Sequence, residues 1–247
     1  LLVWLPAWLI VTAMSLAGLA GKAVWLERDL PQLSRLSARF FNRSGARAWF
    51  WLAPLTVAVG WGLRSRNFFM GDGWALIDNV RKPFYFHANE PLDFFAHQLF
   101  SCLLALLSVK DGAVVYAVLA VLLLPLFLWF LWKISALVRP EKHERTAVFL
   151  ILMFTGCVQL LLGHVESYTL VNLFICLSLC LGLKTIAAKG KNSLWPITAA
   201  TVLAALSHLS AVSLLPALIF VWLYQWRLNK SGRSFTVLFS VCAVAAL

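Results

Sequence analysis

Long apolar runs separated by short basic segments dominate the hydrophobic pattern of this 247-residue chain. A helix that crosses a bilayer needs about 20 mostly apolar residues, with a range of about 17–25. Runs near that length lie at 1–20, 49–63, 94–109, 113–132, 147–163, 168–183, 194–206, 211–226 and 235–247. The pattern therefore predicts an all-α fold, a polytopic bundle of transmembrane helices.

Two apolar stretches, 147–183 and 193–226, are each too long for a single crossing. We expect both to fold as helical hairpins. The first should turn near 163–167, at Gly-His-Val-Glu-Ser, and the second near 207–210, at Ser-His-Leu-Ser.

The composition supports a lipid environment and excludes an ordinary soluble domain. Only 13% of the residues are charged and 62% are hydrophobic, whereas soluble domains carry about 25% charged residues. Twelve Trp and 18 Phe suit a chain anchored at lipid–water boundaries. The net charge of +11 does not indicate nucleic acid as a partner, because the basic residues lie in short loops and form no continuous face.

The topology depends on whether the apolar run at 94–109 crosses the membrane. Its polar residues Asp93, His97, Ser101 and Ser108 recur at helical spacing, so they form one stripe of an amphipathic helix. We therefore interpret 94–109 as an interfacial helix that does not cross.

Charge counting favours the same topology. With 94–109 at the interface, 16 of the 21 Lys and Arg residues fall in loops on one side, as the positive-inside rule expects of the cytoplasmic face. These loops are 21–48, 133–146, 184–192 and 227–233. The loop at 64–93 and the turns near His164 and His208 then share the opposite, non-cytoplasmic face.

We expect residues 1–247 to form a single transmembrane domain with the external loop at 64–93. The chain begins without Met and ends inside an apolar run, so we expect it to be part of a longer protein. We expect a multi-pass protein of the bacterial inner membrane.

Asp72 is the first candidate for chemistry, because it stands between two glycines in the predicted external loop. Flexible backbone lets other groups approach the carboxylate closely, which suits a general base acting on a hydroxyl group. The alternative is an ordinary Asp-Gly turn.

His87 and Glu90 form the second candidate, just before the interfacial helix. They are placed to orient a substrate or metal at the floor of the loop. The alternative is helix-entry chemistry, with Pro91 in the first turn and an acid before it.

The two hairpin turns supply further candidates. Glu166 is an acid inside a long apolar stretch and lies two residues from His164; ionisable groups in such stretches are costly and mark functional sites. Helix capping by Glu166 or Ser167 is the alternative. His208 lies in the second turn, where it either lines a site or only satisfies a helix end.

Basic residues of the external loop, Arg64, Arg66, Arg81 and Lys82, could hold a lipid phosphate, for which Arg is well suited. Ordinary contact with lipid headgroups is the alternative. The sequence has no phosphate-binding glycine loop, no dinucleotide motif, no zinc spacing and no serine-nucleophile elbow. We therefore expect no nucleotide or redox cofactor.

Taken together, these features resemble the GT-C superfamily of membrane glycosyltransferases, in the branch that includes the protein mannosyltransferases. Gly71-Asp72-Gly73 stands where that branch has an essential acid near the start of a large external loop. Glu90-Pro91-Leu92 and the run at 94–109 stand where it has a proline motif and a juxtamembrane helix. The acid is single here, whereas many relatives have an acidic pair, so use of a divalent metal stays open.

The resemblance implies inverting transfer of a sugar from a polyprenyl-phosphate carrier to an acceptor hydroxyl. Asp72 would be the catalytic base, and Arg81 or Lys82 would stabilise the leaving phosphate. His87, Glu90, His164, Glu166 and His208 would bind the substrate. The other partner is membrane lipid, and the sequence does not name the acceptor.

Two other functions fit the composition. A transporter or lipid flippase also carries intramembrane acids and histidines, but usually near the bilayer midplane and with internal repeats. Here these groups lie at turns, and we find no repeat. The third alternative is a non-catalytic membrane subunit.

Overall fold

The computed structural model describes residues 45–65, 73–82, 87–189 and 192–229, and within these ranges every regular element is helical. The elements are α3 (Gly45–Gly62), α4 (Gly73–Asn79), α5 (Pro91–Ala105), α6 (Gly112–Val138), α7 (Lys142–Met153), α8 (Gly156–Leu160), α9 (Thr169–Ala187), α10 (Trp195–Ser207), the 3₁₀ helix η1 (Leu209–Leu214) and α11 (Leu215–Asn229). The prediction of an all-α fold is confirmed for these residues.

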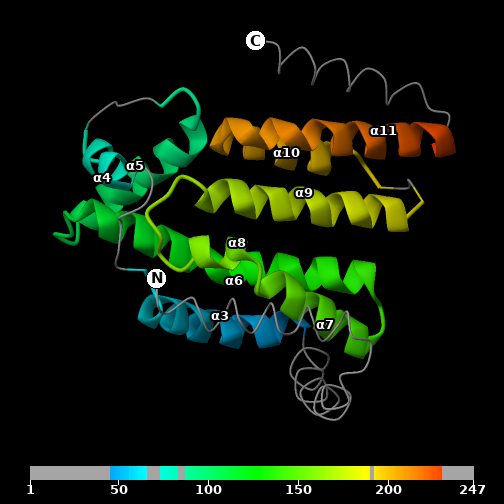
Figure 1. Cartoon of the computed structure of the whole chain (residues 1–247), viewed down its shortest axis with the longest axis horizontal. Helices are drawn as coiled ribbons and strands as arrows, with labels where there is room; N and C mark the ends of the chain where they lie inside the picture. The colour runs from blue at the N-terminus through cyan, green and yellow to red at the C-terminus, as the bar shows by residue number, and fades with distance from the viewer. Residues whose placement is uncertain (1–44, 66–72, 83–86, 190–191, 230–247) are drawn as a thin grey trace, which may run out of the picture.

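The long helices lie side by side, and α4 and α5 sit at one end of the bundle (Figure 1). Helices α6, α9 and α11 run away from that end, while α3 and α10 run toward it. The turn before α9 and the α10–η1 junction consequently lie at the same end as α4 and α5. We call this end, formed by residues 63–65, 73–82, 87–111, 163–168 and 208–214, the loop end.

Three helical segments are long and apolar enough to cross a membrane: Gly112–Val138, Thr169–Ala187 and Leu209–Leu228. Two shorter apolar helices, Trp51–Gly62 and Trp195–Ser207, accompany them. These segments are compatible with an integral membrane protein. The predicted hairpin turns also match, because the chain reverses at 161–168 and again at His208.

The outer faces of the bundle carry large apolar side chains. Trp51, Leu55 and Val59 follow one face of α3 and are all more than half exposed. Such extended apolar surfaces mark contact with a membrane or a partner, and here they lie on the helices predicted to face lipid.

Helix α6 is the centre of the core, which explains its high proportion of apolar residues. Leu124, Phe127 and Leu131 on this helix pack with Leu161 and Leu173. A second cluster at the loop end joins α4 to the start of α6. A helix that is apolar on all sides is expected where it is surrounded by protein and lipid.

The predicted single span at 147–163 is wrong in one respect, because the helix is interrupted. Helix α7 ends at Met153 and α8 begins at Gly156. The Thr155 hydroxyl donates to the Leu152 carbonyl at 2.7 Å, a local bond that competes with the helical pattern. Polarity averaged along the run could not reveal this break.

The predicted interfacial helix differs from the observed helix in its limits and in the direction of its polar stripe. Helix α5 spans Pro91–Ala105, and Ser108 lies beyond it with a φ of 64°. Asp93 and His97 are buried against the protein, while Phe95 and Leu99 are exposed. The polar stripe was expected to face the membrane surface, but its first two members face inward because they meet α6.

Gly112 is required where α4 meets the first residue of α6. A Cβ at this position would lie 2.7 Å from the Ile77 carbonyl oxygen and 3.1 Å from Val80. Because the first contact is with backbone, Gly112→Ala should lower the free energy of unfolding by about 1–3 kcal/mol. Thermal unfolding of the purified protein checks this. Gly62→Ala is the matched control, since a Cβ there has no neighbour within 4 Å, and an equal loss in both variants would contradict the prediction.

Candidate functional site

Glu90 lies at the N-terminus of α5, where its backbone and side chain have separate roles. Pro91 occupies the first turn of the helix, and Glu90 is the N-cap residue, but its side chain makes no capping hydrogen bond. Its carbonyl accepts a hydrogen bond from Phe94 N at 3.0 Å. The carboxylate is therefore available for contacts outside the helix, although the residue is only 8% exposed.

That carboxylate contacts His208, which is 118 positions further along the chain. The His208 Nε2 atom lies 3.1 Å from Glu90 Oε1. The adjacent backbone strengthens the junction, because Leu209 N donates to the Asn89 carbonyl at 2.9 Å. These contacts fasten the start of α5 to the end of α10.

Hydrogen bonds of the His208 ring indicate which of its two nitrogens carries the proton. Its Nδ1 accepts from Ser210 N at 3.1 Å and lies 2.7 Å from the Ser210 hydroxyl. Since Nδ1 is an acceptor, Nε2 carries the ring proton and donates it to Glu90. His208 thus caps η1, as one of its two interpretations proposed, and also reaches Glu90.

Two aromatic side chains complete the surroundings of this pair. His87 Nδ1 lies 3.8 Å from the second Glu90 oxygen, Oε2, so the carboxylate stands between two imidazoles. The ring of Tyr168, at the N-terminus of α9, has its centroid 4.8 Å from that of His208. We call Glu90, His87, His208 and Tyr168 the outer cluster.

The turn before α9 places His164 and Glu166 at the loop end. Gly163 in this turn has a φ of 70°, and a Cβ there would lie 2.9 Å from Arg64 Cβ. Val165 packs with Tyr116 in the loop-end core. Glu166 is half-buried.

Burial lowers the pKa of the His164 imidazole below its ordinary value, since desolvation disfavours the cation. The folded protein therefore holds His164 neutral where the unfolded chain begins to bind a proton. This group should destabilise the fold as the pH falls below about 6.5 and have no effect well above it. Proton NMR of the ring, assigned with His164→Gln, should give a midpoint below that value. A midpoint at or above it would contradict this account.

The predicted phosphate-binding residues are exposed and already paired with acids. Arg81 lies 3.9 Å from Asp111, and Lys82 lies 3.1 Å from Asp78. Exposed pairs of this kind contribute little stability, so a phosphate could replace the carboxylates at small cost. The contact of Arg64 is with an aromatic ring: its guanidinium lies 4.1 Å from the Trp61 ring centroid.

Asp72 and Arg66 lie outside the described residues, so the predicted base has no structural account. The described residues resume at Gly73, the first residue of α4. From there Leu76 and Val80 pack on Val115 and Tyr116, so α4 begins at the loop end.

Asp93, His97 and Tyr116 were not among the predicted site residues, yet they form a deeply buried polar group where α5 meets α6. Asp93 and His97 are 1% and 0% exposed, and Tyr116 is 1% exposed. His97 Nδ1 lies 3.0 Å from Asp93 Oδ2, and the His97 ring stacks on Tyr116 with centroids 3.9 Å apart. We call these three residues the inner cluster. The four-residue spacing of Asp93 and His97 was a usable signal for their pairing.

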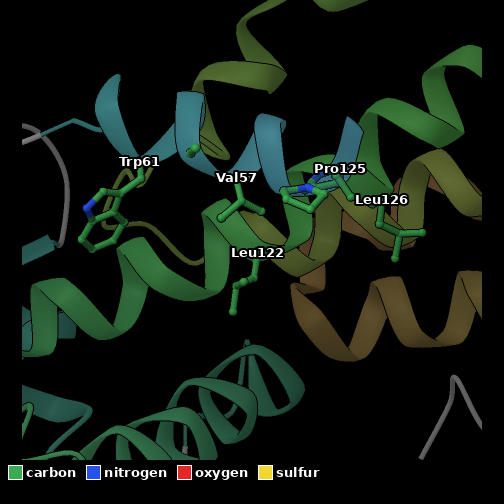
Figure 2. Close-up of a pocket in the computed structure, with 8 residues that line it drawn as sticks. Val57, Trp61, Leu122, Pro125 and Leu126 are labelled. Carbon is green, nitrogen blue, oxygen red and sulfur yellow. The ribbon is translucent and has the colours of Figure 1, made fainter. Parts of the chain in front are cut away.

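Two apolar grooves flank α3. One, of about 740 Å³, lies between α3 and α6, with Val57 and Trp61 on one side and Leu122, Pro125 and Leu126 on the other (Figure 2). The other, of about 790 Å³, is bounded by α3, α6 and the α7–α8 break. Its lining includes Leu63 and Leu162, which adjoin Arg64 because Ser65 N donates to the Leu162 carbonyl at 2.8 Å. We call it the α3–α8 groove.

Among the described residues, no three His, Cys, Asp or Glu side chains are grouped as metal ligands. Comparison with known proteins adds no family assignment: no family model, no curated protein and no solved structure matches this chain.

Proposed function

We propose that this protein is a multi-pass membrane glycosyltransferase of the GT-C type. It would transfer a sugar from a polyprenyl-phosphate donor to an acceptor hydroxyl. The loop end would face the non-cytoplasmic side of a bacterial inner membrane. The observation that carries the proposal is the outer cluster, in which Glu90 is held between His87 and His208 beside Tyr168.

The outer cluster suits a sugar because of its chemistry. A carboxylate accepts hydrogen bonds from hydroxyl groups, and neutral imidazoles can donate or accept them. Tyr168 is 38% exposed, so its ring is available at the edge of the cluster. His164 and Glu166, in the neighbouring turn, would bind further sugar hydroxyls.

The reaction would proceed with inversion. Asp72 would take the proton from the acceptor hydroxyl as its oxygen attacks the anomeric carbon, and the bond from that carbon to the phosphate oxygen would break. The leaving polyprenyl phosphate would keep the electron pair of that bond. Arg81, Lys82 or Arg64 would stabilise its charge, the first two by exchanging their present acidic partners.

The α3–α8 groove supports a lipid-linked donor. It is lined mainly by apolar side chains, and it ends near Arg64 at the loop end. A chain seated there would place its phosphate beside Arg64 at the loop end.

The direct test is turnover of a synthetic short-chain polyprenyl-phosphate hexose by the purified protein in nanodiscs. We expect release of polyprenyl phosphate, with loss of that release in a Glu90→Ala/His208→Ala variant. A wild-type protein that neither binds nor turns over polyprenyl-phosphate mannose or glucose would overturn the proposal.

A further inference from the structure

The inner cluster places three polar side chains where apolar ones would be expected. His97 projects from α5 onto Tyr116, a member of the buried cluster at the loop end, and Asp93 is buried beside it. Transfer of polar groups into such surroundings costs free energy unless their hydrogen bonds are satisfied. Asp93 Oδ1, His97 Nε2 and the Tyr116 hydroxyl are buried and have no hydrogen-bond partner among the described residues. Stability of the core alone therefore does not account for this group.

Contacts within the inner cluster fix the first turns of α5. His97 Nδ1 lies 2.8 Å from the Asp93 carbonyl oxygen and 3.0 Å from Asp93 Oδ2. Both oxygens are acceptors, so Nδ1 carries the proton and donates to them. The stacking of His97 on Tyr116 then holds this part of α5 against α6.

Glu90 belongs to the same helical turn as Asp93. The Glu90 carbonyl accepts from Phe94 N, so a rotation of the first turn would move the Glu90 carboxylate. The inner cluster is consequently connected to the outer cluster through the backbone of the first turn of α5.

We propose that Asp93, His97 and Tyr116 are positioning residues, which hold the Glu90 carboxylate in register with His208 for substrate. The geometry stands without any assumption about the reaction. The effect on catalysis rests on the proposed function.

The decisive variant replaces the polar pair with apolar side chains. Removing one partner of a buried charged pair destabilises a protein, whereas replacing both with apolar residues is often neutral or stabilising. Asp93→Leu/His97→Phe should therefore unfold within about 3 °C of wild type. The imidazole ¹⁵N–¹H signal of His208 should nevertheless shift, and kcat should fall by about 10- to 100-fold.

A conservative variant provides the matched control. In His97→Asn the amide nitrogen can still donate to Asp93, so the His208 signal and kcat should return toward wild type. In His97→Phe, which keeps only a stacking ring, they should not. This pair of variants decides the matter even if the double variant fails to fold.

An unchanged His208 signal in both His97→Phe and the double variant would overturn the inference. The inference would also fail if His97→Asn and His97→Phe had the same His208 signal and the same kcat. If wild type shows no transfer but the His208 signal moves as described, the proposed function fails while the positioning role stands.

Discussion

Asp72→Asn should reduce sugar transfer by about 10²–10⁴-fold, the contribution typical of a positioned general base. The amide cannot accept the acceptor proton, yet it has nearly the same size as the carboxylate. Membrane insertion and thermal unfolding should therefore match wild type. Rates of donor turnover in nanodiscs, at equal protein concentration, measure the effect.

Asp78→Asn is the matched control for that experiment. Asp78 lies in α4, six positions from Asp72, and its carboxylate is exposed and paired with Lys82. It should retain activity within about twofold, because exposed ion pairs contribute little. Full activity in Asp72→Asn would contradict the assignment of Asp72 as the base.

Loss of the Glu90 carboxylate should affect both stability and activity. Glu90→Ala leaves the His208 Nε2–H without its acceptor. The His208 side chain is only 17% exposed, so water cannot readily replace that acceptor. A buried donor without a partner costs about 1–3 kcal/mol, so the melting temperature should fall by several degrees. Transfer should fall further than stability explains, since Glu90 is proposed to contact the sugar.

A double-mutant cycle isolates the pair. Glu90→Ala and His208→Ala should together cost less stability than the sum of the two single changes, because each already removes the same contact. Glu144→Ala serves as a control, since its ion pair with Arg139 is exposed and lies at the opposite end of α6. Additive losses at Glu90 and His208 would show that the two side chains do not interact.

The long apolar helices were predictable from sequence because each follows a long apolar run, whereas the short helix α4 lies inside the stretch predicted as an external loop. The turn at His208 was predictable too, since three polar residues, Ser207, His208 and Ser210, interrupt an apolar stretch there. The α7–α8 break was not, because it depends on a hydroxyl bond of Thr155 to a carbonyl three residues earlier. Average hydropathy carries no information about such a bond.

The candidate site was predictable only as a set of residues that share one side. Topology placed Glu90 and His208 together, but their 3.1 Å contact joins positions 118 apart and depends on how α5 packs on α10. The inward direction of Asp93 and His97 was missed for a related reason. Their partner Tyr116 lies on another helix, and a polar stripe alone does not tell whether it faces water or another polar side chain.

The location of the loop end on one side of the membrane is the central claim, and cysteine accessibility tests it most directly. Single cysteines would be placed at Asp78, Lys110 and Ser210, with Glu141 and Lys189 as opposite-end controls, in a background lacking the five native cysteines. All five positions are exposed. We predict that an impermeant reagent added outside intact cells labels positions 78, 110 and 210, and labels 141 and 189 only after permeabilisation. Labelling of positions 78 and 110 from opposite sides would mean that α5 crosses the membrane, and would contradict the one-sided site.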